Sequence, residues 1–184
     1  MFIQTEDTPN PDTLKFMPGD TVLKTGSVDF SNAESSVSSP LATRLFEIEG
    51  VSRVFLSSDF ISVTKESALE WNTLKPSILT GIMEHYSSGL PALNTEADIT
   101  EDNSAEDTET IKQIKDLLET RVRPAVAMDG GDISFCSFAS GVVTLQMKGA
   151  CAGCPSSTAT LKMGIENMLR HYIPEVTEVK AAEL

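Results

Sequence analysis

Residues 149–157, Gly-Ala-Cys-Ala-Gly-Cys-Pro-Ser-Ser, stand between a strand pattern and a helical pattern and hold two of the three cysteines. Two thiols in a C-x-x-C turn can share one metal centre or one disulfide, and the glycines around them allow the backbone to fold tightly. Two thiolates do not complete a tetrahedral metal site or an iron–sulfur cluster, which normally takes four ligands. The shortfall suggests that a second copy of the chain, or another protein, supplies the remaining ligands.

Three features make Cys151 and Cys154 candidate metal ligands. They lie at the start of a predicted helix, where the positive end of the helix dipole favours thiolates. Soft thiolate pairs bind iron–sulfur centres, zinc or copper(I) in preference to hard ions. The neighbouring Gly149 and Gly153 leave backbone N–H groups that can point at sulfur. A thioredoxin-like dithiol is the main alternative, but its motif should follow the first strand of a βαβ unit, and this one follows a hairpin. A zinc site would need further ligands.

The elements around this turn predict a small α+β domain over residues 109–184. Residues 108–128 have a helical apolar stripe, residues 133–138 and 142–147 form an antiparallel pair joined at Ser140-Gly141, and Ser156 or Ser157 caps a helix that ends at Pro174. Residues 176–179 could add an edge strand. We interpret residues 129–132, Asp-Gly-Gly-Asp, as a tight helix-to-strand turn with a positive φ at one of its two glycines.

The first domain, residues 1–90, also has a mixed pattern and no visible catalytic constellation. Short strands are predicted at 14–16 and 21–23, a helix opens at Ser39-Pro40, a hairpin covers 51–64, and a second helix covers 74–86 and stops at Gly89. Residues 91–108 are acidic and contain few large apolar side chains, so we predict a flexible, self-repelling linker. The fold class is therefore α+β, with two small α/β sandwich domains joined by a flexible acidic linker.

The remaining notable side chains have simpler interpretations. Cys136 reads as a small strand residue on the face that also holds Ser134 and Phe138, with a third ligand or a redox thiol as the alternative. His85 and His171 lie at the margins of helices and are interpreted as structural. Trp71 reads as a packing anchor.

Charge and composition exclude several classes of function. The net charge is −13, which argues against nucleic acid as the main partner. Residues 1–90 carry 6 basic and 12 acidic side chains, residues 91–109 carry 0 and 7, and residues 110–184 carry 8 and 8, so the cysteine domain is neutral. No apolar run approaches the ~20 residues of a membrane span. The acidic N-terminus lacks the pattern of a signal or transit peptide, so we expect a soluble intracellular protein.

With these residues in view, the chain resembles the Nfu family of iron–sulfur cluster carrier proteins over nearly its whole length. The second domain looks like the C-terminal domain of NifU, and four stretches carry that likeness: residues 123–132, 149–157, 160–166 and 171–176. The first domain is similar to the Nfu N-terminal domain at residues 3–6, 8–11, 14–16, 18–19 and 39–42.

The resemblance implies a [4Fe–4S] cluster, with [2Fe–2S] as the alternative, that is bridged between two subunits by Cys151 and Cys154. It implies a homodimer on cluster binding, transfer of the cluster to apo iron–sulfur enzymes, upstream cluster-assembly proteins as donors, and no enzymatic activity, nucleic acid or membrane partner. The family has no cysteine at the place of Cys136. The expected location is the bacterial cytoplasm, with the mitochondrial matrix as the alternative for a processed form.

Overall fold

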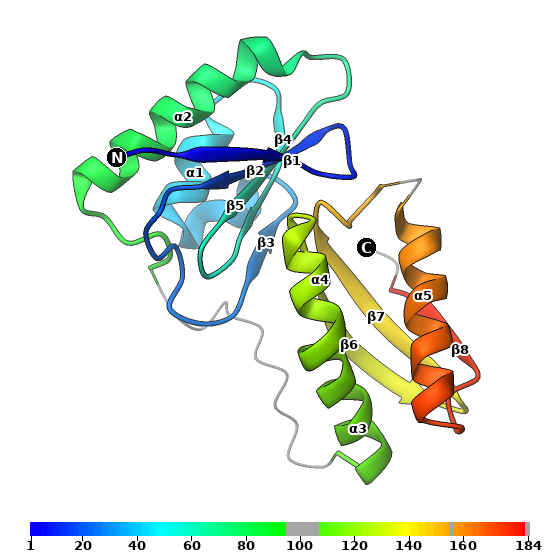
Figure 1. Ribbon diagram of the computed structural model, residues 1–184. Coiled ribbons are helices and arrows are strands. Elements are labelled where there is room, and N and C mark those ends of the chain that lie inside the picture. Colours follow the sequence, from blue (N-terminus) through cyan, green and yellow to red (C-terminus); the bar gives the residue numbers. More distant parts are fainter. Residues whose placement is uncertain (95–106, 155–156, 183–184) are drawn as a thin grey trace. The chain divides into compact units, whose positions relative to one another are not determined.

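A computed structural model describes residues 1–94, 107–154 and 157–182. The chain divides into two compact units, Met1–Glu101 and Asp102–Leu184 (Figure 1). Each unit has helices on a sheet, so the predicted α+β class with two domains is confirmed. Most of the predicted acidic linker, residues 95–106, lies outside the described residues.

The first unit is built on a five-stranded antiparallel sheet in the order β1-β2-β5-β4-β3 (Figure 1). Its strands are β1 (Gln4–Asp7), β2 (Thr13–Met17), β3 (Val28–Phe30), β4 (Val51–Leu56) and β5 (Ile61–Lys65). The predicted hairpin of β4 and β5 is confirmed. The strand predicted at 21–23 is wrong, because that segment is a loop and β3 takes the sheet edge. Val22 and Leu23 are still buried there, which explains their strand-like apolar pattern.

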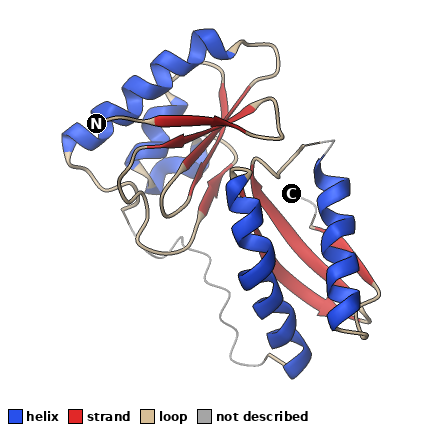
Figure 2. Ribbon diagram, viewed as in Figure 1, coloured by secondary structure: helices blue, strands red, loops and turns tan. Residues whose placement is uncertain are grey.

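Helices pack against this sheet (Figure 2). They are α1 (Pro40–Phe46) and α2 (Trp71–Ser88), and the 3₁₀ helix η1 (Glu34–Ser38) precedes α1. The helix α1 opens at Ser39-Pro40 as predicted, and the Ser39 hydroxyl caps it by accepting a hydrogen bond from the Ala42 N–H at 3.0 Å. Gly89 ends α2 in the left-handed conformation with φ 68°. The core between sheet and helices includes Phe16, Leu41, Leu45, Val54, Ile61, Ile78 and Ile82.

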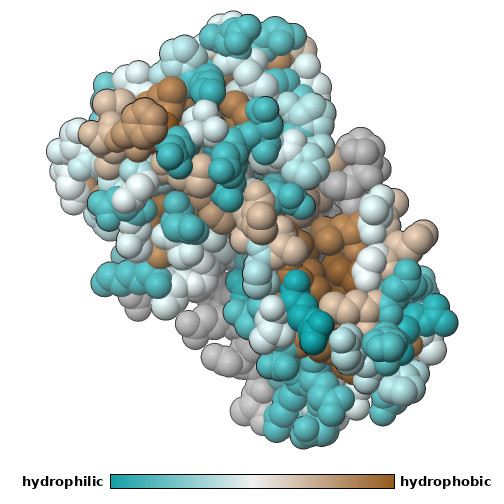
Figure 3. Space-filling model, viewed as in Figure 1, coloured by the Kyte–Doolittle hydropathy of each residue, from teal (hydrophilic) through white to brown (hydrophobic). Residues whose placement is uncertain are grey.

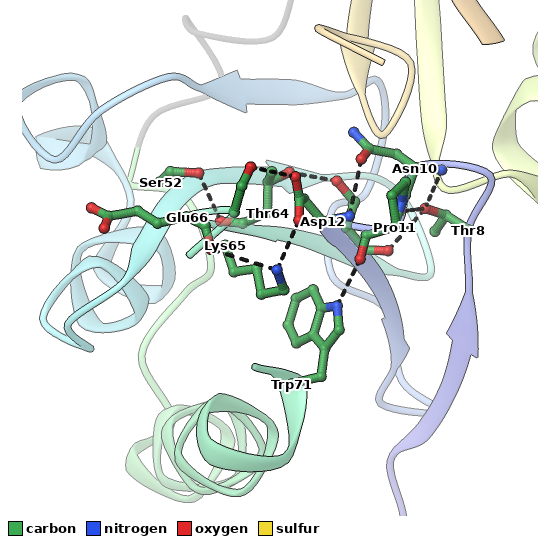
Figure 4. Close-up of polar contacts among 11 residues, drawn as sticks. Thr8, Asn10, Pro11, Asp12, Ser52, Thr64, Lys65, Glu66 and Trp71 are labelled. Atoms are coloured by element: carbon green, nitrogen blue, oxygen red, sulfur yellow. Dashed lines mark hydrogen bonds and ion pairs between the residues drawn. The ribbon is translucent and has the colours of Figure 1, made fainter. Parts of the chain in front are cut away.

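The loop between β1 and β2 is fastened by polar contacts to β5 and α2 (Figure 4). The Trp71 indole N–H donates to the Pro11 carbonyl at 2.9 Å, and the Lys65 ammonium donates to Asp12 at 2.7 Å. The Asn10 side-chain oxygen accepts from the Asp12 N–H at 3.1 Å. Trp71 therefore anchors this loop through a hydrogen bond as well as through packing.

Residues 91–94 pack against the first unit, although the sequence assigned them to the linker. The Asn94 N–H donates to the Ser38 carbonyl at 2.8 Å, and the Ser39 hydroxyl donates to the Ala92 carbonyl at 2.5 Å. Ala92 and Leu93 also contact the apolar core.

The second unit has a three-stranded sheet in the order β6-β7-β8. Its strands are β6 (Gly131–Ala139), β7 (Val142–Gly149) and β8 (Glu178–Ala181). The predicted hairpin is confirmed, and its turn at Ser140-Gly141 has φ 51° and 80°, the combination of a two-residue type I′ turn. β8 pairs with β7 in parallel, so α5 (Ser157–Tyr172) is the crossover between them.

The predicted helix over 108–128 is confirmed in extent but contains an interruption. It consists of α3 (Glu109–Leu117), the π-helical turn η3 (Leu118–Val122) and α4 (Arg123–Met128). Pro124 has no N–H to donate to the carbonyl four residues earlier, so the regular hydrogen-bond ladder cannot pass through it. We attribute the π turn just before Pro124 to this missing donor.

A bulge in β6 reverses the predicted side-chain alternation. Phe135 pairs with Leu145 and Ser137 with Thr144, so Cys136 is the extra residue and is exposed. Phe138 therefore joins Phe135 against the core, and its predicted place beside Cys136 is wrong. An alternation rule cannot foresee this, because one extra residue shifts the pattern by one position.

Candidate metal centre

The C-x-x-C turn begins where β7 ends and is attached to the turn that opens β6. Gly149 has φ 61°, and its carbonyl accepts from the Ala152 N–H at 3.1 Å, which closes the turn around Cys151. The Ala150 N–H donates to the Gly130 carbonyl at 3.1 Å. Gly130 itself has φ 77°, so the predicted helix-to-strand turn is confirmed at this glycine. The two glycine-rich segments thus support each other.

Thr158, which the sequence did not single out, ties both cysteines to the start of α5. Its N–H donates to the Cys154 carbonyl at 3.2 Å, and its hydroxyl donates to the same carbonyl at 2.7 Å and to the Cys151 carbonyl at 3.3 Å. The motif therefore opens a helix, as predicted. The capping role predicted for Ser156 or Ser157 falls on atoms outside the described part of the chain.

Both thiols are buried in the chain as it stands. Cys151 is 5 % exposed and Cys154 is 1 % exposed. Burial raises the pKa of the Cys151 thiol to about 12, and the negative charges of Asp129, Cys154 and Asp132 act in the same direction. The thiolate that the sequence predicted at a helix N-terminus is therefore not favoured at neutral pH. A soft metal would have to displace the thiol proton on binding.

Gly131 is the closest support of the Cys151 side chain. A Cβ at this position would lie 2.6 Å from the Cys151 sulfur and 2.8 Å from the Lys148 carbonyl oxygen. The second glycine of the Gly130-Gly131 pair is thus needed for close approach, whereas the first supplies the positive φ. The sequence indicated this close approach only through the pair of adjacent glycines, since a single glycine would have sufficed for the turn.

A partly buried ion pair between Arg123 and Asp132 holds the same turn against α4. The Arg123 guanidinium donates to both carboxylate oxygens of Asp132, at 2.8 and 2.9 Å, and to Glu119 at 2.5 Å. The Asp132 side chain is 8 % exposed, and the carboxylate holds the pKa of Arg123 above its ordinary value. Asp132 also accepts from the Ile133 N–H at 2.8 Å. This bidentate ion pair links α4 to the first residues of β6.

Cys151 and Cys154 are among the residues that line one small pocket of about 380 Å³. The rest of its lining is mainly apolar and comes from Met147, Ala152, Gly153, Thr158, Ala181 and Ala182. A Cβ at Gly153 would meet nothing within 4 Å, so the turn leaves space on its outer side. Two soft donors on one turn beside a mainly apolar pocket fit a soft metal or a cluster.

The argument from the sequence against a thioredoxin-like dithiol is wrong. It held that the C-x-x-C motif does not follow the first strand of a βαβ unit. Because β8 is parallel to β7, the segment β7–α5–β8 is a βαβ unit, and the C-x-x-C motif does follow its first strand. Other observations disfavour redox cycling. A redox-active cysteine is a partly exposed, low-pKa thiolate, whereas Cys151 is buried with a raised pKa.

Among the described residues, no further ligands stand ready to complete a site in the same chain. Within residues 1–94, 107–154 and 157–182, no three His, Cys, Asp or Glu side chains are grouped so that they could hold a metal ion. Cys136 is exposed on the β6 bulge. His171 is exposed and stacks edge-on against Tyr172 at 4.9 Å, and His85 belongs to the first unit.

A shallow apolar groove runs between α4 and α5, where Figure 3 shows hydrophobic surface. Its volume is about 290 Å³, and its apolar lining comprises Val122, Ala125, Val126, Leu161, Ile165 and Met168. Arg121 also lines the groove, and its guanidinium stands 5.0 Å from the Tyr172 ring, so a cation–π contact joins η3 to α5. No described helix is long and apolar enough to cross a membrane.

A two-domain chain whose second domain presents a paired-thiol turn is typical of scaffold proteins that handle metal clusters. Comparison with family models agrees with this class. Residues 3–89 match the model described as "Scaffold protein Nfu/NifU N terminal", and residues 114–180 match the "NifU-like domain". The chain belongs to the Nfu/NifU scaffold family.

Individual relatives are similar along the whole chain. It is 54 % identical to the NifU-like protein 4, mitochondrial, of Arabidopsis thaliana over 98 % of this chain and 65 % of that protein. It is 52 % identical to the NFU1 iron-sulfur cluster scaffold homolog, mitochondrial, of Homo sapiens over 98 % of this chain and 71 % of that protein. A solution structure of a NifU-like protein from Saccharomyces cerevisiae aligns at 25 % identity and a TM-score of 0.47, covering 52 % of this chain and 87 % of that one.

Proposed function

We propose that this protein is an iron–sulfur cluster carrier in which Cys151 and Cys154 of two subunits together hold one [4Fe–4S] cluster. The observation that carries the proposal is the pair of free cysteines on one turn, where both belong to the lining of one mainly apolar pocket of about 380 Å³. Membership of a scaffold family and the printed names of the relatives support the cluster as cargo. A [2Fe–2S] cluster remains the alternative cargo.

The dimer follows from ligand number and symmetry. Two thiolates per chain become four across a two-fold axis, and a two-fold dimer is the commonest symmetric assembly. The groove between α4 and α5 gives the same unit apolar surface to bury against a second copy. Because both thiols are buried, the turn must expose its sulfurs when the cluster binds. The positive-φ glycines on either side of the motif, Gly149 and Gly153, are suited to that movement.

Transfer needs ligand exchange and no catalytic acid, base or nucleophile. A client thiolate forms a bond to one iron atom, the bond from that iron to a carrier cysteine breaks, and the released carrier thiolate takes up a proton. Four such exchanges move the cluster without any change in its electron count. We therefore propose a carrier and not an enzyme, with apo iron–sulfur enzymes as clients.

The two domains have separate roles in this proposal. Residues 109–184 carry the cluster, residues 1–90 recognise clients or upstream assembly proteins, and the acidic segment 91–108 lets the domains reorient. The first four residues of that segment pack on the first unit, so the effective tether begins after Asn94. Deleting residues 1–90 tests the division, because undiminished transfer to every client and unchanged client binding would both contradict it.

For the location we propose the mitochondrial matrix. The names of the relatives, from a plant and an animal, carry the word mitochondrial. That supports the alternative location predicted from the sequence, whereas the bacterial cytoplasm gains no support. The chain spans 65 % of the length of the first of these relatives, so the activity and partners of the whole relative enter here only as part of the proposal.

Anaerobic reconstitution with iron and sulfide tests the proposed cargo. We expect a [4Fe–4S] Mössbauer signal, about four irons per two chains, and elution as a dimer. Replacing Cys151 or Cys154 by Ala should abolish the cluster and the cluster-linked dimer and leave the fold intact. Cys136→Ser is the matched control and should load fully. Colourless protein that retains zinc, or wild-type loading of the Cys154→Ala variant, would contradict the proposal.

A further inference from the structure

The short segment that carries Cys151 is bounded by two glycines in the left-handed region. Gly149 has φ 61° and Gly153 has φ 73°, and glycine can leave such a conformation at little steric cost. A Cβ at Gly153 would meet nothing within 4 Å, so neighbouring atoms do not block a change of its backbone. The two glycines therefore suit a movement of residues 150–152 as one segment.

In the closed position of this segment, Cys151 is part of the apolar core of the second unit. Its sulfur lies against Gly131, where a Cβ would come within 2.6 Å of it, and the residue is 5 % exposed. A bulky reagent or a client protein therefore reaches the sulfur only when the segment moves outward. The contacts that hold the segment in place set how often that happens.

Contacts on both sides tie the segment to its surroundings. The Ala150 N–H donates to the Gly130 carbonyl at 3.1 Å, which attaches the segment to the turn before β6. The Thr158 hydroxyl donates to the Cys151 carbonyl at 3.3 Å, which attaches the segment to the first turn of α5. The first contact joins two backbone atoms, whereas the second depends on one side chain. A substitution at Thr158 can therefore change the second contact selectively.

The Thr158 hydroxyl is shared between two acceptors. Besides the Cys151 carbonyl, it reaches the Cys154 carbonyl at the shorter distance of 2.7 Å. A hydroxyl has one proton to donate, and the bond to Cys154 still holds that proton when the longer contact is released. The contact to Cys151 is thus a weak restraint that breaks without leaving the donor unpaired. Such a restraint suits a segment that has to open and close.

We propose that the Thr158 hydroxyl is the latch of the C-x-x-C turn. It holds residues 150–152 in the closed position, and its release from the Cys151 carbonyl exposes the Cys151 sulfur. Thr158 is a positioning residue, because it acts on the cysteine through the backbone and does not touch the metal. The step that the latch controls is the entry of iron or of a client thiolate, and this part rests on the proposed function.

Thr158→Val tests the latch in the full chain without a cluster, because valine is similar in shape and has no hydroxyl. One readout is the rate at which N-ethylmaleimide modifies Cys151, measured by peptide mass spectrometry. The other is the exchange rate of the Ala150 amide proton, which does not depend on thiol chemistry. Loss of one weak hydrogen bond should raise both rates about threefold. Cys136 is exposed, and its modification rate is the internal reference that should not change.

Two further variants separate a latch from a merely structural hydroxyl. Thr158→Ser restores a hydroxyl and should return both rates to the wild-type values. Thr120→Val removes a hydroxyl that donates to the Asp116 carbonyl four residues earlier at 2.7 Å, the same bond that Thr158 makes to Cys154, and should leave both rates unchanged. Wild-type rates for Thr158→Val, or an equal acceleration by Thr120→Val, would overturn the proposal.

Reconstitution with iron and sulfide then connects the latch to the cluster. Thr158→Val should reach the wild-type iron content about threefold faster, because entry waits for the segment to open. Equal loading rates for Thr158→Val and the wild type would overturn the role of the latch in cluster entry. A wild-type chain that binds no cluster would overturn the proposed function instead, whereas the modification and exchange rates, measured without a cluster, decide the latch by themselves.

Discussion

Replacing Gly131 by Ala should damage the cysteine site in a measurable and specific way. The new Cβ would lie 2.6 Å from the Cys151 sulfur, 2.8 Å from the Lys148 carbonyl oxygen and 3.1 Å from the Cys151 nitrogen. Favourable contacts of a carbon atom lie near ~3.5–4.0 Å, so all three are too close. Two of the three atoms belong to the backbone. Rotation of the Cys151 side chain can relieve the first contact only, and it would also displace the sulfur from its pocket.

The magnitude follows from the cost of over-packing. Extra atoms in a well-packed region typically cost ~1–3 kcal/mol, and we expect about 2 kcal/mol here because the backbone must move. In a domain of this size, ~1 kcal/mol shifts Tm by about 4–8 °C. The unfolding transition of the second unit should therefore fall by about 8–16 °C. The transition of the first unit should not move, so it serves as an internal reference.

The assay combines calorimetry of the full chain with cluster content after reconstitution at a temperature where the variant is folded. Gly164→Ala is the matched control, since a Cβ at that position of α5 meets nothing within 4 Å. It should stabilise the second unit by up to ~1 kcal/mol, because alanine favours a helix. An unshifted second transition for Gly131→Ala, together with full cluster content, would refute the reasoning.

Three further predictions concern other contacts. Asp132→Asn removes the charge that pairs with the Arg123 guanidinium and should lower the free energy of unfolding of the second unit in urea by about 2 kcal/mol. The effect is smaller than for a fully buried pair because the arginine is partly exposed. An unchanged unfolding midpoint would contradict this prediction. Burial lowers the pKa of His85, so its contribution to the stability of the first unit is complete above pH 6.5 and is lost as the pH falls through the lowered value. His85→Leu should remove that slope in urea titrations across this pH range. Ser39→Ala deletes the cap of α1 and the bond to Ala92, and should cost about 1–2 kcal/mol in thermal unfolding of the first unit.

Much of the architecture could be read from local patterns. The hairpin of β6 and β7, the long helix α2 and the start of α1 at Ser39-Pro40 were predicted because periodicity and helix-start signals are properties of neighbouring residues. The C-x-x-C pair was found for the same reason, since its two thiols are close in sequence. Predictions failed where the same apolar pattern fits two structures, as at 21–23, where Val22 and Leu23 are buried without forming a strand.

The sequence by itself determined the two-domain α+β class, the acidic segment between the domains and the two thiols that define the site. Only the tertiary structure decided that Gly131 supports Cys151, that the Cys136 bulge returns Phe138 to the core, and that β8 makes the motif part of a βαβ unit. It also decided that both thiols are buried. The physical reason is that periodicity and turn chemistry are local, whereas burial, pKa and close approach depend on residues that folding brings together from distant parts of the chain.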